Sequence, residues 1–154
     1  MLRQLLVGGG VSAINIAIHA SVVAIILVRI VRTESRWQTS KSHPAVFLMA
    51  VMISTVLILM AGHTVEVFVW ALAYLIVGIA PGAADLVYFS FVNYTTLGYG
   101  DIVPVERWRL LGPITALNGV LLIGWSTAVI FEVLQRARLR TQRPPRGRRH
   151  RARR

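Results

Sequence analysis

A long interval without basic residues restricts the folds open to this chain. No lysine or arginine occurs between Ser42 and Glu106, and the acidic residues inside that interval are Glu66, Asp85 and Asp101. Of the 154 residues, 55% are hydrophobic, more than a soluble domain of this size carries. We therefore expect an all-α membrane protein in which most of this interval lies in lipid.

Three apolar segments are each long enough to cross a bilayer as a helix. The first covers residues 5–30, and its polar interruptions are Ser12, Asn15, His19, Ser21 and Arg29. Its length and the lack of a small-residue cleavage site argue against a cleaved signal peptide. The second segment covers residues 45–80, and the third covers about 110–134.

The second segment, 36 residues long, is too long for one perpendicular span and too short for two. The residues around Gly62 lack the turn signals that two antiparallel spans would need. We expect one tilted helix that projects past the hydrocarbon or bends near Gly62. Its predicted stop is at Pro81-Gly82.

A shorter segment follows, residues 83–94, which is apolar and aromatic but too brief to span a bilayer. Residues 95–101 come next and include two glycines. A short helix plus irregular backbone at membrane depth predicts a re-entrant loop that lines a water-filled path. Arg107, Trp108 and Arg109 then combine basic and aromatic side chains suited to the membrane interface.

Basic residues near the ends of the spans predict the orientation, because cytoplasmic loops carry the excess of lysine and arginine. Four lie from Arg29 to Lys41, and ten of the seventeen in the chain lie from Arg136 to Arg154. We expect both stretches in the cytoplasm, with the N-terminus and the re-entrant loop outside. The C-terminal tail has few apolar residues, so we expect it to be disordered and to contact anionic lipids, not nucleic acid.

The residues of the 95–101 loop have the types needed to bind a dehydrated monovalent cation. Such an ion needs closely spaced oxygen dipoles, and backbone carbonyls supply them where alternating glycines, here Gly98 and Gly100, permit unusual dihedral angles. The predicted potassium ligands are the carbonyls of Thr96, Leu97, Gly98 and Tyr99, with the Thr96 hydroxyl.

A complete site of this kind requires several chains. One chain carries one such loop, so four chains around an axis are needed to close rings of oxygens. Tyr99 is expected to pack outward and hold the loop open, and Asp101 to form a cation-attracting ring at the outer mouth. The prediction is a homotetramer with potassium as the permeant ion, no other cofactor and no enzymatic activity.

The order of residues from Thr96 to Asp101, Thr-Leu-Gly-Tyr-Gly-Asp, resembles the filter pattern Thr-Val-Gly-Tyr-Gly-Asp of the potassium-channel pore-domain superfamily. The resemblance implies passive potassium conduction by residues 44–135, as outer helix, pore helix, filter and inner helix. Residues 1–43 then form an added transmembrane helix with a cytoplasmic loop, and residues 136–154 form the tail. The added helix lacks the regularly spaced arginines of a voltage sensor.

One position departs from the family pattern. Many relatives carry a glutamate one turn before the first filter threonine, where this chain has Val92. A carboxyl pair with Asp101 is therefore absent. Our hypothesis is that Tyr88, Asn93 or Trp108 supports the loop instead.

His63 and Glu66 lie three residues apart on one face of the second segment, near the outer interface by residue count. One interpretation is a sensor of protons or divalent cations. The other is an interhelical hydrogen bond, including one to Arg107 or Arg109. The second is favoured because polar residues in spans generally find partners.

Asn118 introduces a polar side chain into the third segment. If it faces the axis, it lines a water-filled cavity; if it faces a neighbouring helix, it joins the two. The cavity is the expected position. Gly119 and Gly124 are the candidates for a hinge, although glycine also allows close helix packing.

Other classes of function are also compatible with a membrane chain. A secondary transporter would carry several such loops and internal repeats, which this chain lacks. A non-selective cation channel usually loses part of Gly98-Tyr99-Gly100, and an intact loop argues against a non-conducting interaction subunit. These last two functions remain alternatives. The absence of cysteine excludes disulfides and thiolate metal sites.

Overall fold

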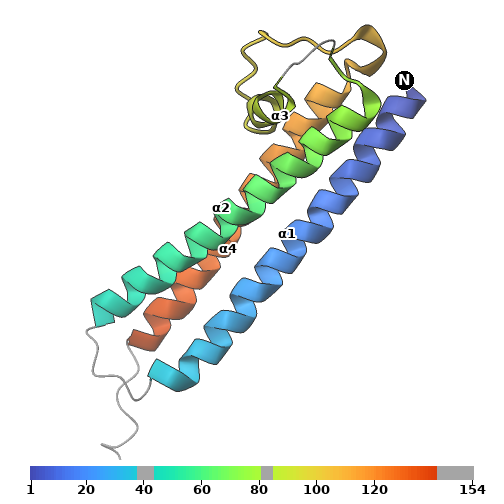
Figure 1. Cartoon of the computed structure of the whole chain (residues 1–154). Helices are drawn as coiled ribbons and strands as arrows, with labels where there is room; N and C mark the ends of the chain where they lie inside the picture. The colour runs from blue at the N-terminus through green and yellow to red at the C-terminus, as the bar shows by residue number, and fades with distance from the viewer. Residues whose placement is uncertain (38–43, 81–84, 142–154) are drawn as a thin grey trace, which may run out of the picture.

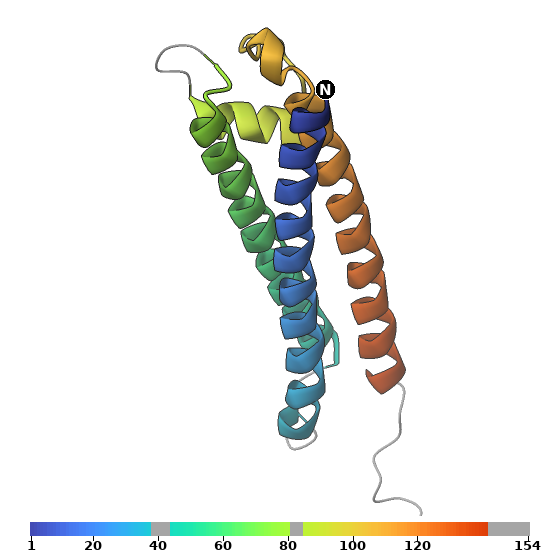
Figure 2. The same cartoon turned by 90° about the vertical axis from the view of Figure 1, so that its right-hand side faces the viewer.

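The computed structural model describes residues 1–37, 44–80 and 85–141, which form an elongated helical bundle (Figures 1 and 2). The elements are α1 (Leu2–Trp37), α2 (Pro44–Val77), α3 (Leu86–Tyr94), the 3-10 helix η1 (Glu106–Trp108) and α4 (Leu111–Thr141). The three long helices lie side by side, and α3 crosses near one end of them. The N-terminus lies at that same end (Figure 2).

The long helices confirm the predicted membrane fold. Three stretches are long and apolar enough to cross a membrane, namely Leu2–Ile30, Ala45–Val77 and Glu106–Leu139. No strand occurs in the parts of the chain that the structure describes. As expected of a helix in lipid, α2 exposes large apolar side chains along its length, including Met49, Leu57, Phe68, Leu72 and Ile76.

The second apolar segment forms one helix, as predicted, but it ends earlier than expected. The last residue of α2 is Val77, and Gly78 adopts a left-handed φ of +62°. The backbone N–H of Ile79 donates to the Tyr74 carbonyl at 3.1 Å, which is the Schellman arrangement for ending a helix at glycine. The stop is therefore local and precedes Pro81-Gly82.

The C-terminal end of α4 corrects a second prediction. The stretch expected to be disordered from Arg136 onward begins as helix, because α4 continues to Thr141. The Arg136 Nε atom lies 2.5 Å from Glu132 Oε1 one turn earlier, and Ala137 is buried. Ion pairs at this spacing and good helix formers favour continued helix. Residues 142–154, the rest of the predicted tail, lie outside the described residues.

Two apolar cores hold α1 against α2 and α4. The core near α3 is built from large residues, including Trp70, Tyr74, Phe89, Tyr94, Trp108 and Leu111. The core toward the opposite end contains Val23, Ile26, Leu59, Val129 and Val133. Between the two cores along each long helix lies a layer of buried polar residues, including Asn15, His19, Glu66, Asn118 and Ser126.

Small residues let α1 approach both other long helices closely. A Cβ atom added at Gly8 would lie 2.8 Å from Ile114 of α4, and one added at Gly62 of α2 would lie 3.2 Å from Val22 of α1. Such spacing leaves no room for a larger side chain without displacement. The predicted added helix is therefore packed into the bundle as tightly as the helices it joins.

Candidate functional site

The short helix α3 begins because Asp85 caps it. The Asp85 carboxylate accepts hydrogen bonds from the backbone N–H groups of Val87 at 3.1 Å and Tyr88 at 2.9 Å, which is the usual N-cap arrangement. The helix ends at Tyr94, and the N–H of Thr95 donates to the Phe91 carbonyl at 2.9 Å. The 95–101 loop therefore begins at a well-defined helix end.

The backbone of the loop alternates in handedness. Thr96, Gly98 and Gly100 have φ values of +62°, +58° and +77°, and these are the positive-φ residues of the loop. A left-handed residue at every second position turns successive peptide groups in a way that regular helix and strand do not. For a threonine the left-handed conformation costs roughly 1–2 kcal/mol, so it needs support from its surroundings.

The end of α3 supplies that support. The N–H of Thr96 donates to the Asn93 carbonyl at 3.0 Å, and the N–H groups of Leu97 and Gly98 donate to the Val92 carbonyl at 2.9 and 3.3 Å. No described residue donates a backbone hydrogen bond to the carbonyls of residues 96–99. The amides of residues 95–98 are therefore occupied, and the carbonyl oxygens of residues 96–99 are free to bind a cation.

Two side chains, Val92 and Tyr88, show what replaces the glutamate that this chain lacks. Val92, which stands in its place, is buried and supports the loop through its backbone carbonyl. Tyr88, one of the three residues proposed as a substitute, donates a hydrogen bond from its hydroxyl to Asp101 Oδ2 at 2.6 Å. This bond to the carboxylate raises the pKa of Tyr88 to about 12, so the hydroxyl keeps its proton at neutral pH.

The other two proposed supports make different contacts. Asn93 Nδ2 donates to the Phe89 carbonyl one turn earlier, at 2.8 Å. Trp108 is buried, and the Arg3 guanidinium of α1 lies 5.1 Å from its ring centre. Tyr88 is therefore the proposed residue that directly contacts Asp101.

The side chains of the loop lack cover within one chain. Leu97 is 54% exposed and Tyr99 is 66% exposed. The predicted outward packing of Tyr99 therefore requires a surface that a single chain does not provide.

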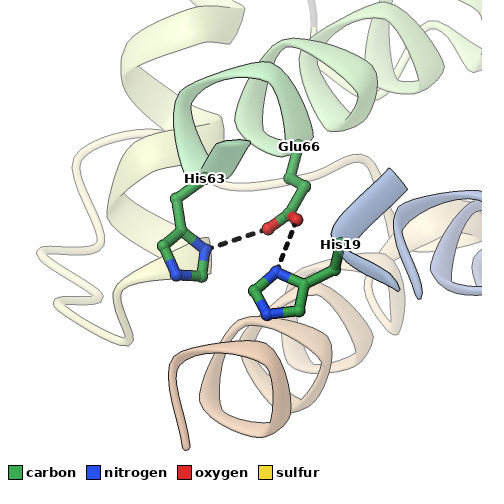
Figure 3. Close-up of side chains that lie close together, drawn as sticks. All are labelled: His19, His63 and Glu66. Carbon is green, nitrogen blue, oxygen red and sulfur yellow. Dashed lines mark hydrogen bonds and ion pairs between the residues drawn. The ribbon is translucent and has the colours of Figure 1, made fainter. Parts of the chain in front are cut away.

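A cluster of polar side chains lies beneath α3, in the layer between the two cores (Figure 3). Glu66 of α2 is fully buried, and each of its carboxylate oxygens meets a histidine. His19 Nδ1 of α1 lies 2.9 Å from Oε1, and His63 Nδ1 of α2 lies 2.9 Å from Oε2. A buried carboxylate in a membrane helix requires such partners.

Two further side chains complete this polar cluster, which we define as His19, His63, Glu66, Tyr94 and Ser126. The hydroxyl of Tyr94, the last residue of α3, donates to Glu66 Oε2. Ser126 Oγ of α4 lies 2.8 Å from His63 Nε2 and 3.5 Å from His19 Nε2. The cluster therefore joins all three long helices to the end of α3.

The contacts of His63 and Glu66 agree with the favoured interpretation, an interhelical hydrogen bond. Their partners come from α1, α3 and α4, and not from Arg107 or Arg109, the partners that the sequence suggested. The pair lies between the two apolar cores, because the residues that follow on α2, Val67 and Trp70, belong to the core near α3, and Leu59, which precedes the pair, belongs to the other core.

The structure also corrects the expected position of Asn118. Its side chain is 3% exposed, and its Oδ1 atom accepts from Asn15 Nδ2 at 3.2 Å and from Trp70 Nε1 at 3.1 Å. The same Asn15 nitrogen lies 3.2 Å from the Glu66 carbonyl. Asn118 therefore joins helices of its own chain instead of lining a cavity, because two buried donors need its oxygen.

The two hinge candidates differ in their surroundings. A Cβ atom at Gly119 would lie 2.0 Å from the Tyr94 carbonyl oxygen, whereas one at Gly124 would meet nothing within 4 Å in the chain. Both lie inside the continuous helix α4. Gly119 is therefore needed so that the end of α3 can rest on α4.

Sequence reasoning gave no role to several residues that the fold brings together. Three of them, His19, Tyr94 and Ser126, are members of the polar cluster. The fourth, Asn15, donates to the backbone carbonyl of Glu66. A signal was present in the first span, because Asn15 and His19 stand one helical turn apart in an otherwise apolar helix. Such a polar face in a span indicates a buried partner, although it does not say which one.

Comparison with known proteins gives one finding. Residues 62–136 match the model of a family described as an ion channel, and the matched stretch covers the second part of α2, α3, the 95–101 loop and most of α4. No curated protein and no solved structure gives a match. The helix α1 lies outside the matched stretch.

Proposed function

We propose that this multi-pass membrane protein is a potassium-selective channel subunit, because residues 62–136 match the model of an ion-channel family and Thr96 to Asp101 resemble a potassium filter. The observation that carries the proposal is the backbone of the 95–101 loop. The amides of residues 95–98 are bonded to the end of α3, the φ values are positive at alternate residues from Thr96 to Gly100, and no described residue donates a backbone hydrogen bond to the carbonyls of residues 96–99.

Potassium is the ion whose hydration shell such carbonyls replace. The carbonyls of Thr96, Leu97, Gly98 and Tyr99, with the Thr96 hydroxyl, supply stacked oxygens along one strand of backbone. A single strand provides one side of each ring, so selectivity requires further copies around the ion. The exposure of Leu97 and Tyr99 in a single chain supports a homotetramer in which neighbouring copies cover them.

The proposed orientation puts the loop outside the cell and the C-terminal end of α4 in the cytoplasm. The N-terminus and α3 lie at the same end of the bundle (Figure 2), as the count of basic residues predicts. The described part of the basic stretch, from Arg136 to Thr141, continues α4. We place its arginines near anionic lipid headgroups at the cytoplasmic surface.

The proposal is tested with purified protein in liposomes. Bi-ionic reversal potentials should show a potassium permeability at least about tenfold greater than that for sodium, and cross-linking in the membrane should end at a tetramer. Equal permeabilities would establish a non-selective cation channel instead. No flux from a tetramer inserted in the correct orientation would favour a non-conducting interaction subunit.

A further inference from the structure

The polar cluster contains a set of metal-ligating atoms from two helices. His19, His63 and Glu66 each offer one ligand atom, and these atoms all lie within 4.8 Å of one another (Figure 3). We propose that these three side chains bind a divalent transition-metal ion, Zn²⁺ in the first instance, and that the ion ties α1 to α2 beneath the end of α3. The proposal adds a ligand from α1, which lies outside the family match.

The donor set agrees with the chemistry of zinc. Two imidazoles and one carboxylate are a common three-ligand set for Zn²⁺, with a fourth position left open. Hard cations such as Mg²⁺ and Ca²⁺ prefer oxygen ligands alone. A tetrahedral zinc site keeps its ligand atoms roughly 3.3 Å apart, and each histidine Nδ1 already lies 2.9 Å from a Glu66 oxygen. A small outward shift would admit the ion.

The number of hydrogen-bond donors and acceptors around Ser126 favours a bound metal ion. Without one, each histidine that donates from Nδ1 to Glu66 needs a donor at Nε2, and both Nε2 atoms face Ser126 Oγ. A serine hydroxyl has one hydrogen and two lone pairs, so it can satisfy only one of them. With an ion on both Nδ1 atoms, both Nε2 atoms carry hydrogens, and the Ser126 oxygen can accept both.

This arrangement also resembles a second coordination shell. Histidine ligands usually donate their other ring nitrogen to an oxygen that fixes the ring, and ligating carboxylates are usually hydrogen-bonded as well. Ser126 is placed for the first role, and the Tyr94 hydroxyl, which donates to Glu66, performs the second. Both supports are present before an ion binds.

The charge of Glu66 and the exposure of His63 also favour a bound cation. The ion-pair partners of Glu66 among the described side chains are the two histidines, so a cation would offset a carboxylate that is costly to bury in lipid. Glu66 and His19 are 0% and 1% exposed, while His63 is 20% exposed. His63 is therefore the ligand through which an ion enters.

The binding test uses the full-length protein in detergent, purified without a polyhistidine tag. Equilibrium dialysis against Zn²⁺ should give about one ion per chain, and Co²⁺ in its place should give the visible absorption of a tetrahedral site. His19→Ala and His63→Ala should each lower the affinity more than about tenfold. Thr64→Ala is the control, because Thr64 neighbours His63 but its hydroxyl, among the described residues, bonds to the Met60 carbonyl alone.

A measurement of folding and a second variant distinguish loss of the metal site from loss of the fold. Helicity by circular dichroism shows whether each variant is folded, and Ser126→Ala keeps all three ligands while removing the second-shell oxygen. We expect Ser126→Ala to lower zinc affinity about tenfold. The proposal is overturned if the wild-type protein binds no Zn²⁺, or if His19→Ala binds as much as Thr64→Ala does.

The consequence for conduction rests on the proposed function and is measured separately. Tyr94 links the cluster to Thr95 and the loop, so Zn²⁺ should change potassium flux in liposomes for the wild-type protein but not for His19→Ala. Zinc binding without any potassium flux would leave the metal site standing and reject the channel function. Flux that Zn²⁺ leaves unchanged would reject the coupling between them.

Discussion

The 95–101 loop and the polar cluster beneath it differ in whether their polar groups find hydrogen-bond partners within one chain. In the loop, the carbonyls of residues 96–99 accept no backbone hydrogen bond from described residues, and Leu97 and Tyr99 are exposed. In the cluster, the Glu66 carboxylate has His19, His63 and Tyr94 of the same chain as hydrogen-bond partners. Within one chain the loop therefore leaves carbonyl oxygens without donors and large apolar side chains without cover, which agrees with the proposed tetramer and ion, whereas the cluster joins helices of a single chain. Substitutions in the two regions should consequently affect different properties.

The largest effect is expected on conduction, from Gly98→Ala. Its φ of +58° becomes unfavourable by about 1 kcal/mol in each copy once a Cβ is present. We expect potassium flux in liposomes to fall at least roughly 100-fold, because the carbonyls lose their alignment in every copy at once.

The matched control for that substitution is Gly10→Ala, a glycine of α1 at which an added Cβ meets nothing within 4 Å. Its flux should equal that of the wild-type protein. Equal flux from both variants would show that the loop conformation is not required for conduction.

The next largest effect is expected on stability, from Glu66→Ala in the cluster. Loss of the carboxylate leaves the donors of His19, His63 and Tyr94 without an acceptor in a buried site. We expect a loss of about 3 kcal/mol in the free energy of unfolding, measured by denaturation in mixed micelles. Glu132→Ala removes a carboxylate that is 46% exposed and should cost no more than about 0.5 kcal/mol. Similar losses for the two variants would contradict a special role for the buried cluster.

A smaller loss is expected from Gly119→Ala, at the contact between the two regions. The new Cβ would lie 2.0 Å from the Tyr94 carbonyl oxygen, so α3 must move, at a cost of about 1–3 kcal/mol. Thermal unfolding of Gly119→Ala and Gly124→Ala compares two glycines of one helix. If both lower the midpoint equally, helix propensity and not the α3 contact is responsible.

The smallest effect is expected from Tyr88→Phe, which removes the bond to Asp101. The pKa of Tyr88, raised to about 12, lies above its ordinary value of about 10. The contact is therefore complete below about pH 10 and is lost as the pH rises through 12. The variant should show faster loss of current during sustained recording, by the same factor at about pH 7 and about pH 9. If this factor were smaller at about pH 9 than at about pH 7, the upward direction of the Tyr88 pKa shift would be contradicted.

Most of the helical framework could be predicted from the sequence. The three spans, the single long helix α2 and the short helix before the loop follow from segment length and hydropathy. The errors lie at helix ends. Gly78 ends α2 before the proline-glycine pair, and the pair of Glu132 with Arg136 carries α4 into the basic stretch. Both depend on a few local contacts that hydropathy does not report.

The partners of the buried polar residues could not be predicted in the same way. Asn118 was expected to face a cavity, and it bonds to Asn15 and Trp70 instead. The face that a helix turns toward its neighbours depends on how all the helices pack, and several rotations are compatible with an apolar sequence.

The sequence by itself determined the membrane fold and suggested the proposed chemistry of the 95–101 loop. Both are local properties, since hydropathy is summed over one segment and the loop uses consecutive backbone carbonyls with glycines at alternate positions. Only the tertiary structure decided what Glu66 binds, because its partner His19 lies 47 residues away on another helix. Contacts at that separation depend on the docking of whole helices, and the docking of α1 brought a third ligand to His63 and Glu66.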